Sequence, residues 1–105
     1  MSHGWSDSEK QVAQKAAVRA RSAAEEEALR LFRDYAVKTA DDLWQLELKI
    51  REWRRDRQHV FTLNYSRAEE QIADWISRGW LRSSDVDALS LARVDRIRSS
   101  TGFTR

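Results

Sequence analysis

The chain contains no proline in its 105 residues, and this absence constrains its fold more than any other feature of the sequence. Proline and glycine mark most turns, and the chain has only three glycines to serve in place of proline. A β-sandwich or a β-barrel needs a turn about every 8–12 residues, so neither is easily built from this composition. The sequence therefore predicts a single all-α domain with a long N-terminal helix and three shorter helices.

The first two helices are expected to begin at capping patterns. Ser6 and Glu9 have the spacing of a capping box, in which each side chain accepts a hydrogen bond from the other residue's backbone N–H. Nothing after them breaks a helix, so we expect the first helix to continue to about Val37. Residues 39–42 form the next cap, and the second helix is expected to run to about Thr62.

The last two helices have similar boundary patterns. Residues 66–69 repeat the capping-box spacing and are expected to start the third helix, which Gly79 ends as the left-handed residue after its last turn. A fourth helix is expected to start at residues 83–85 and to fade over residues 99–102. Residues 1–105 are thus expected to form one helical domain, with a frayed tail over residues 100–105.

The first half of the first helix carries a stripe of alanines in place of bulky apolar residues. Alanine side chains bury little area, but they allow another helix to approach closely, and that helix can belong to a second copy of the chain. We therefore expect an oligomer, with Ala16 and Ala20 among the residues between two copies. The alternative is a half-solvated helix of high intrinsic propensity.

Five tryptophans are many for so short a chain, and the helical period separates them. Trp53, Trp75 and Trp80 fall on or beside apolar stripes and are expected in the core, whereas the pattern leaves Trp5 unassigned. Trp44 lies on the other face of the second helix, where an indole is typical of an anchor for a protein partner. The alternative for Trp44 is burial in a homodimer seam or against the first helix.

The second helix has two apolar faces. Leu43, Leu46 and Ile50 fall on one stripe, which we assign to the core and to contacts between two copies. Leu48 lies about 40° from Trp44 around the helix axis, roughly opposite that stripe. We therefore expect Leu48 and Trp44 to belong to the same outer, partner-binding face.

Catalytic and metal-binding patterns are absent from the sequence. There is no cysteine, and the only histidines, His3 and His59, are isolated from each other, so a thiolate nucleophile and a transition-metal ligand set are missing. The carboxylate runs at residues 25–27 and 41–42 do not converge, because neighbouring helical residues point about 100° apart. No glycine-rich phosphate loop is present. We therefore expect no enzyme, no metal and no cofactor.

The apolar runs of the sequence are only a few residues long, whereas a membrane-spanning helix needs about 20 apolar residues. The first residues also lack the charged-then-apolar pattern of a secretory signal. The sequence therefore predicts a cytoplasmic protein with no membrane partner.

Residues 49–57 form a basic cluster with five basic and two acidic side chains. Arginines beside an aromatic residue suit phosphate backbones or acidic protein surfaces, so one hypothesis is a small helical nucleic-acid-binding module. The alternative is a solvated, salt-bridged face, because the acidic residues stand at helical spacing from the basic ones. The net charge of only +2 disfavours the nucleic-acid hypothesis. The arginines concerned are Arg51, Arg54, Arg55 and Arg57.

Residues 41–46, Asp-Asp-Leu-Trp-Gln-Leu, resemble the fluorescence recovery protein family, whose members are small all-helical regulators of the cyanobacterial orange carotenoid protein. Trp5, Ser6 and Glu9 are similar to the family's helix entry. The resemblance covers roughly residues 5–98. Its further matches, at compatible spacing, are Arg54, Ile72, Gly79, Leu81, Leu89 and Ile97.

This resemblance implies a non-catalytic homodimer that holds no cofactor and has a long-helix stalk, over residues 6–62, and a smaller helical head, over residues 63–99. Family members bind the light-activated red form of the orange carotenoid protein and speed its return to the orange form. The resemblance implies partner-binding roles for Trp44, Arg54 and Arg96, and it places Leu43 in the dimerisation region.

Three positions depart from the family pattern. Leu48 stands where the family carries a functional aspartate, Glu47 where a histidine is common, and Glu70 where an aromatic residue contacts the partner. These changes alter charge complementarity, which governs the choice of partner. The alternative function is therefore a homologue of the same type with a different protein partner.

Overall fold

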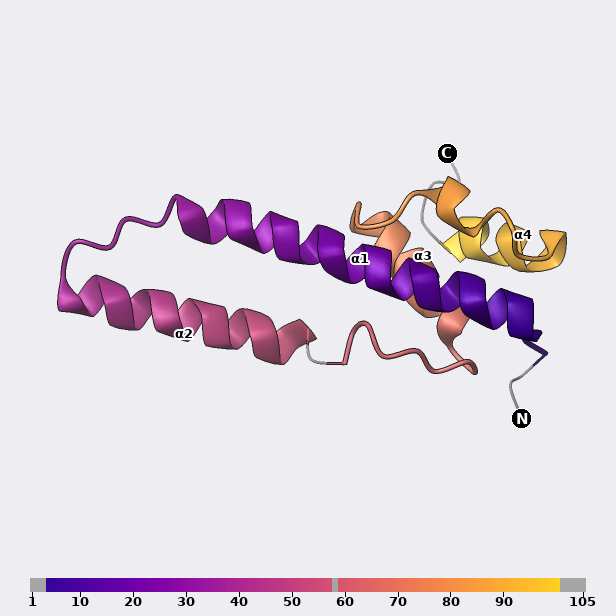
Figure 1. The fold of residues 1–105 in the computed structure, drawn as a ribbon, viewed down its shortest axis with the longest axis horizontal. Helices are drawn as coiled ribbons and strands as arrows, with labels where there is room; N and C mark the ends of the chain where they lie inside the picture. The colour runs from indigo at the N-terminus through magenta and orange to yellow at the C-terminus, as the bar shows by residue number, and fades with distance from the viewer. Residues whose placement is uncertain (1–3, 58, 101–105) are drawn as a thin grey trace.

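The computed structural model describes residues 4–57 and 59–100, and every regular element within these ranges is helical (Figure 1). The predicted fold class, a long N-terminal helix followed by three shorter helices, is confirmed. His3 and residues 101–105 of the predicted tail lie outside the described residues. The elements are α1 (Asp7–Arg33), α2 (Ala40–Arg57), α3 (Ala68–Ser77), a short 3-10 helix η1 (Ser83–Val86) and α4 (Leu91–Ser100).

Helix α1 begins with the predicted capping box. The Glu9 N–H donates to Ser6 Oγ at 3.1 Å, and the Ser6 N–H donates to Glu9 Oε1 at 3.3 Å. The two bonds satisfy N–H groups that have no acceptor inside the helix. At its other end α1 stops at Arg33, earlier than the predicted end at Val37.

Helix α2 begins with a side-chain cap of its own, a few residues after the end of α1. The Asp42 carboxylate accepts the N–H groups of Lys38 and Thr39 at 3.1 and 3.2 Å, and Thr39 Oγ1 accepts the Asp42 N–H at 3.2 Å. A side chain thus satisfies N–H groups at the start of α2 that have no acceptor inside the helix. The predicted cap at residues 39–42 is confirmed.

Helix α2 ends at Arg57, earlier than the predicted end at Thr62. After it the chain turns, and the Val60 N–H donates to the carbonyl of Arg57 at 3.3 Å. The indole Nε1 of Trp75 donates to the Val60 carbonyl at 3.1 Å. The packing of α3 thus gives the Val60 carbonyl, in the turn after α2, a hydrogen-bond donor.

The capping box predicted at the start of α3 is wrong. Ser66 donates from its N–H and its Oγ to Asn64 Oδ1, at 3.2 and 2.7 Å, and does not cap the helix. The Glu69 carboxylate, expected to reach back to Ser66, accepts hydrogen bonds from Arg93 and Arg96. Two guanidinium groups are stronger partners for a carboxylate than one neutral backbone N–H.

The predicted end of α3 at Gly79 is confirmed. Gly79 has φ of +79°, and its N–H donates to the Ile76 carbonyl at 3.0 Å. The Trp80 N–H donates to the Trp75 carbonyl, also at 3.0 Å. The pair of bonds is a Schellman motif, and it returns the buried Trp80 side chain to the core.

The fourth helix starts later than predicted. Residues 83–85 form part of the short η1 only, where the Asp85 carboxylate accepts the Arg82 N–H at 2.9 Å. Helix α4 begins directly after Ser90, whose Oγ accepts the Arg93 N–H at 3.4 Å. The serine that caps α4 is therefore Ser90. The pattern at residues 83–85 starts only the single turn of η1.

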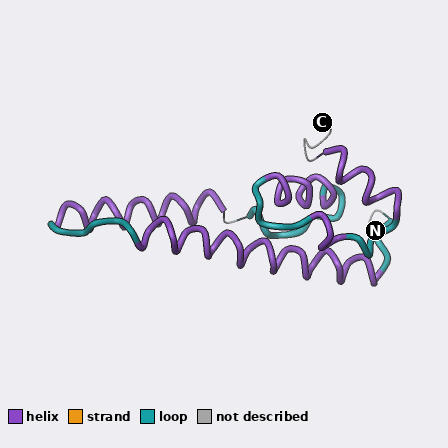
Figure 2. Tube along the Cα trace, turned by 90° about the horizontal axis from the view of Figure 1, so that it is seen from above, coloured by secondary structure: helices purple, strands orange, loops and turns teal. Residues whose placement is uncertain are grey.

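The head forms where α3 and η1 lie against the N-terminal half of α1 and α4 packs against α3 (Figures 1 and 2). The alanine stripe of α1 allows this close approach, because its buried members present no bulky side chain. Trp5, which the pattern left unassigned, is buried here. The predicted apolar stripes of the third and fourth helices are confirmed as core, and their largest fully buried side chains are Trp75, Ile72, Ile97 and Val86.

The stalk forms where α2 runs antiparallel beside the C-terminal half of α1 and beyond its end (Figures 1 and 2). The radius of gyration of the Cα atoms is 16.7 Å, whereas a compact domain of this length has about 13 Å, so the molecule is elongated. No side chain of α2 is buried. The prediction that Leu43, Leu46, Ile50 and Trp53 form core is therefore wrong within one chain, because only a single helix, α1, lies against α2.

Candidate protein-binding site

Exposed apolar side chains are concentrated in the stalk. Seven of the nine large apolar side chains exposed in the described part of the chain lie between residues 29 and 50, in the end of α1, the connecting loop and α2. Isolated exposed apolar residues are ordinary, but a cluster of them marks an interaction surface. The seven are Leu29, Leu31, Val37, Leu43, Trp44, Leu48 and Ile50.

Trp44 and Leu48 lie on the outer face of α2, as the helical period predicts. They are four residues apart, so their side chains are neighbours on the helix surface. Trp44 is 64% exposed and Leu48 46%, whereas the other four tryptophans are buried or half-buried. The pair therefore places an indole and a leucine side by side on the surface of the single chain.

The five residues assigned to a dimer interface divide into two groups. Leu43 and Ile50 are exposed on α2, and Leu46 on the same helix is half-buried. Ala16 and Ala20 are buried in the head, in the same core as α3 and η1. The helix that approaches the alanine stripe belongs to the same chain, so the assignment of these two alanines to a surface between copies is corrected.

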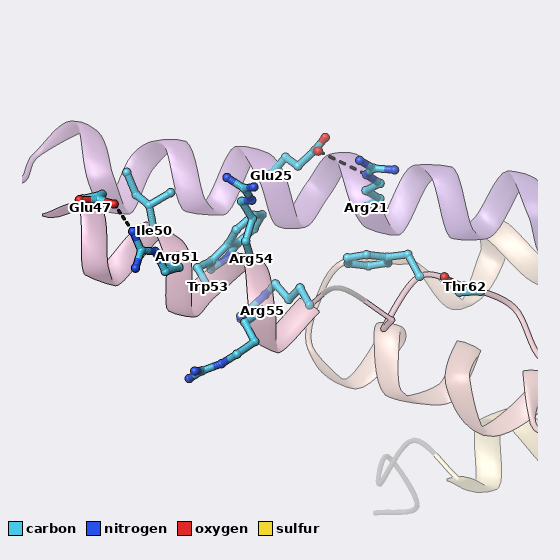
Figure 3. A pocket seen from close by; sticks show the side chains of 11 residues that line it. Arg21, Glu25, Glu47, Ile50, Arg51, Trp53, Arg54, Arg55 and Thr62 are labelled. Atoms are coloured by element: carbon cyan, nitrogen blue, oxygen red, sulfur yellow. Dashed lines mark hydrogen bonds and ion pairs between the residues drawn. The ribbon is translucent and has the colours of Figure 1, made fainter.

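Arg54 lines a groove of about 1020 Å³ between α1 and the C-terminal half of α2 (Figure 3). In Figure 3 the Arg54 side chain points from α2 toward α1, where Arg21 and Glu25 lie, whereas Arg55 points away from α1. Arg54 follows Trp44 by ten residues, which is about 15 Å along a helix. The two residues therefore share one helix but lie toward opposite ends of it.

Arg96 lies on α4 in the head, and the single chain does not bring it together with Trp44 or Arg54. Its Nε and Nη2 donate to the two carboxylate oxygens of Glu69 at 2.8 and 2.9 Å, a bidentate pair. These hydrogen bonds, with the charge of Glu69, hold the pKa of Arg96 above its ordinary value. The side chain remains 57% exposed, so it can still meet a partner while paired.

Arg93 is the charged residue at the centre of the head, and the sequence analysis assigned it no role. It is only 7% exposed and donates to Glu9 at 3.2 Å, to Glu69 at 2.6 Å and to the Gly4 carbonyl at 3.3 Å. Its guanidinium also lies 3.9 Å from the centroid of the Trp5 ring, a cation–π contact. The signal for its burial is its place four residues from both Leu89 and Ile97, on the apolar stripe.

The two carboxylates around Arg93 have lowered pKa values. Desolvation raises the pKa of Glu9, but hydrogen bonds from the Ser90 and Ser6 N–H groups and the charge of Arg93 outweigh it, so the net shift is downward. Hydrogen bonds from Arg96, together with the charges of both arginines, lower the pKa of Glu69 against the effect of its desolvation. Both groups therefore stay ionised at neutral pH and hold the head together.

Within residues 4–57 and 59–100, no cluster of three or more histidine or carboxylate side chains is placed to hold a metal ion. The described helices also include none that is both long enough and apolar enough to cross a membrane. What the described residues do offer is an apolar patch and a basic groove, both on the stalk and both suited to binding a macromolecule.

No family model matches the chain, and no curated protein matches it significantly. Among solved structures, the chain matches that of the fluorescence recovery protein of Fremyella diplosiphon with a TM-score of 0.82. The match covers 93% of this chain and 98% of that chain, at 26% sequence identity. The resemblance found in the sequence is thereby confirmed, and over nearly its whole length this chain is similar to the fluorescence recovery protein.

Proposed function

We propose that the protein is a non-catalytic, dimeric regulator of the fluorescence recovery type, which acts in the cytoplasm. Its partner would be an orange carotenoid protein or a related carotenoid-binding protein, whose return from the red to the orange form it accelerates. The observation that carries the proposal is the exposed Trp44 side chain, on α2 of a fold similar to that of the Fremyella diplosiphon protein. Such a role needs no catalytic group, because differential binding to two forms of a partner shifts their populations.

The dimer is supported by the apolar surface of the stalk. Leu43, Leu46 and Ile50 form a stripe on α2 that α1 only partly covers. A second stalk laid against this stripe would remove it from water, and each fully buried leucine or isoleucine contributes roughly 1.5–3 kcal/mol. We therefore assign the interface to this stripe, without Ala16 and Ala20.

The partner-binding face is assigned to Trp44 and Leu48. Leu48 stands at the position where the family carries an aspartate, and it makes the surface beside the Trp44 indole more apolar. The two acidic replacements are neutralised locally, since Glu47 pairs with Arg51 and Glu70 pairs with Arg67. The alternative proposal, a different protein partner for the same type of dimer, rests on this change of surface chemistry.

The test is to mix the purified protein with photoactivated orange carotenoid protein and follow the red-to-orange decay by absorbance. We expect acceleration that saturates with protein concentration. Trp44→Ala should raise the half-saturating concentration at least about 30-fold, because a tryptophan anchor contributes about 2 kcal/mol or more. The matched control is Leu91→Ala, which removes an 83% exposed apolar side chain from the head and should leave the decay unchanged.

Two results would contradict the proposal. A decay rate that stays at its spontaneous value at saturating protein excludes the orange carotenoid protein as the partner and favours the alternative. Equal effects of Trp44→Ala and Leu91→Ala would show that the stalk face is not where the partner binds. Molecular mass measured for each variant ensures that a lost dimer is not mistaken for a lost contact.

A further inference from the structure

The groove between α1 and α2 is strongly basic. Five arginines and two glutamates line it, a net charge of +3 in a chain whose overall charge is only +2. The rings of Trp53 and Phe61 also line it. A groove of this kind combines fixed positive charge with aromatic surface. Its lining on α2 begins at Glu47, within one helical turn of Trp44, and continues to the end of the helix. Its arginines are Arg21, Arg51, Arg54, Arg55 and Arg57.

The arginines of the groove are not equally available. Arg21 pairs with Glu25 at 3.4 Å, and Arg51 pairs with Glu47 (Figure 3). Among the described residues, no carboxylate lies within ion-pairing distance of Arg54. The groove therefore contains a guanidinium that points toward α1 without an anionic partner.

Arg57 also lines the groove without an ion-pair partner among residues 4–57 and 59–100, and aromatic rings hold it in place. Its guanidinium carbon lies 5.3 Å from the centroid of the Trp53 ring and 5.5 Å from that of Trp80. Its Nε is buried and, within the described residues, has no hydrogen-bond acceptor. A buried N–H without an acceptor is unfavourable, and a group already fixed by its neighbours loses little entropy when it binds.

We propose that this groove binds an acidic segment of the protein partner, which places two carboxylates on Arg54 and Arg57 and an apolar side chain against Trp53 and Phe61. The two arginines are one helical turn apart, about 4.5 Å along the axis, which an extended peptide spans in one or two residues. The segment therefore carries acidic residues one or two positions apart. The inference rests on the proposed function only in taking the protein to bind a protein partner.

The composition of the groove favours a peptide over a nucleic acid. Glu25 and Glu47 stand inside it, and they would repel a phosphate backbone, which carries a charge at every step. A peptide can place its carboxylates against Arg54 and Arg57 and present neutral residues elsewhere. The surface is thus selective for the spacing of negative charges and not simply for their number.

The test uses a fluorescein-labelled peptide of twelve residues, in which glutamates alternate with glycine and leucine, and a counterpart with glutamine in place of glutamate. Fluorescence anisotropy with the full chain should show binding of the glutamate peptide alone, weakened by salt. Arg54→Gln and Arg57→Gln should each weaken binding about tenfold, the effect of one charge-assisted hydrogen bond. Circular dichroism establishes that Arg57→Gln is folded, and Arg54→Gln carries the test if it is not.

The matched control is Lys49→Gln, which removes the same charge from the same helix outside the groove and should leave peptide binding within about twofold. An equal loss with Lys49→Gln would overturn the proposal in favour of a diffuse charge effect. If a single-stranded nucleic acid of twelve nucleotides bound more tightly than the glutamate peptide, the proposal would be overturned in favour of a nucleic-acid partner. No peptide binding, with a lower molecular mass for Arg54→Gln, would assign the groove to a second copy. The peptide-binding assay contains no carotenoid protein. It can therefore fail while the red-to-orange relaxation assay succeeds, or succeed while the relaxation assay fails.

Discussion

Arg93 and Glu9 form an ion pair at 3.2 Å between residues that are 84 positions apart in the chain. The Glu9 carboxylate that pairs with Arg93 also completes the capping box of α1 and accepts the Ser90 N–H at 3.2 Å. One side chain thus fixes the start of α1 relative to the start of α4. The side chains of Arg93 and Glu9 are only 9% and 14% exposed, so water screens this pair poorly.

Replacing Arg93 by methionine should destabilise the head. The variant leaves the Glu9 and Glu69 carboxylates without their shared partner in a poorly solvated site, so we expect the free energy of unfolding to fall by about 2–3 kcal/mol. Urea unfolding followed by circular dichroism measures the change. Arg30→Met, at an exposed position of α1, is the matched control and should change stability by no more than about 0.5 kcal/mol. A loss no larger than that of the control would show that the pair is dispensable.

Acid should destabilise the protein through Glu9 and Glu69. Both pKa values lie below the ordinary 4.5 in the folded state, so the unfolded chain binds more protons as the pH falls through this range. Their contribution to stability is therefore complete above the unfolded pKa and is lost as the pH falls through the lowered folded values. Melting temperatures from pH 7 to pH 3 should decrease most steeply below about pH 4.5.

Glu69→Gln isolates one of these two carboxyls. It should lower the melting temperature at pH 7, since a neutral amide pairs more weakly with Arg93 and Arg96, and flatten the decrease below pH 4.5. Glu26→Gln, at an exposed position of α1, should keep the full pH dependence. The explanation fails if both variants follow the unmodified chain across the whole pH range.

Gly79→Ala should destabilise the end of α3 through the backbone alone. Gly79 has φ of +79°, and a Cβ built there meets no atom within 4 Å, so the substitution is strained without being crowded. We expect a loss of about 1 kcal/mol, and a smaller loss for Gly79→Asn, because asparagine tolerates the left-handed region better than alanine. Thermal unfolding of the two variants measures the difference. Alanine and asparagine variants of equal stability would contradict this account.

Leu43→Asp should shift the protein toward the monomer. It places a charge in the α2 stripe that we assign to the dimer, where an unpaired carboxylate is strongly unfavourable. Sedimentation equilibrium of the variant and of Leu91→Asp, the same substitution at an exposed apolar position of the head, measures the effect. A dimer dissociated by Leu91→Asp and not by Leu43→Asp would move the interface to the head.

Local sequence patterns predicted the boundaries whose partners are close in the chain. The Ser6–Glu9 capping box and the Gly79 turn each depend on residues within five positions, so their geometry follows from the sequence alone. The identical spacing at Ser66 and Glu69 failed, because Glu69 pairs with Arg93 and Arg96, which are 24 and 27 residues away. A competitor at that distance is invisible to a four-residue pattern.

In the candidate site, too, the features set by one helix could be predicted from the sequence, and those set by tertiary packing could not. The helical period predicted that Trp44 and Leu48 share one face of the helix, but it left open whether Trp44 lies against another helix, and the structure exposes both side chains. The period could not distinguish core from interface on the opposite stripe, because Leu43 and Ile50 are apolar in either case and only tertiary packing decides between the two. The burial of Arg93 required the paired carboxylates of two other elements, Glu9 and Glu69.

Helix α2 buries none of its 18 residues, and this has a kinetic consequence. A helix of this length is marginal in water when little tertiary packing supports it, so the α2 backbone should open far more often than the head. Amide protons of α2 would then exchange with solvent in seconds to minutes in a free monomer and much more slowly once a second chain covers the helix. The exchange rate of this one segment, followed by mass spectrometry, would report continuously on how much of the protein is bound.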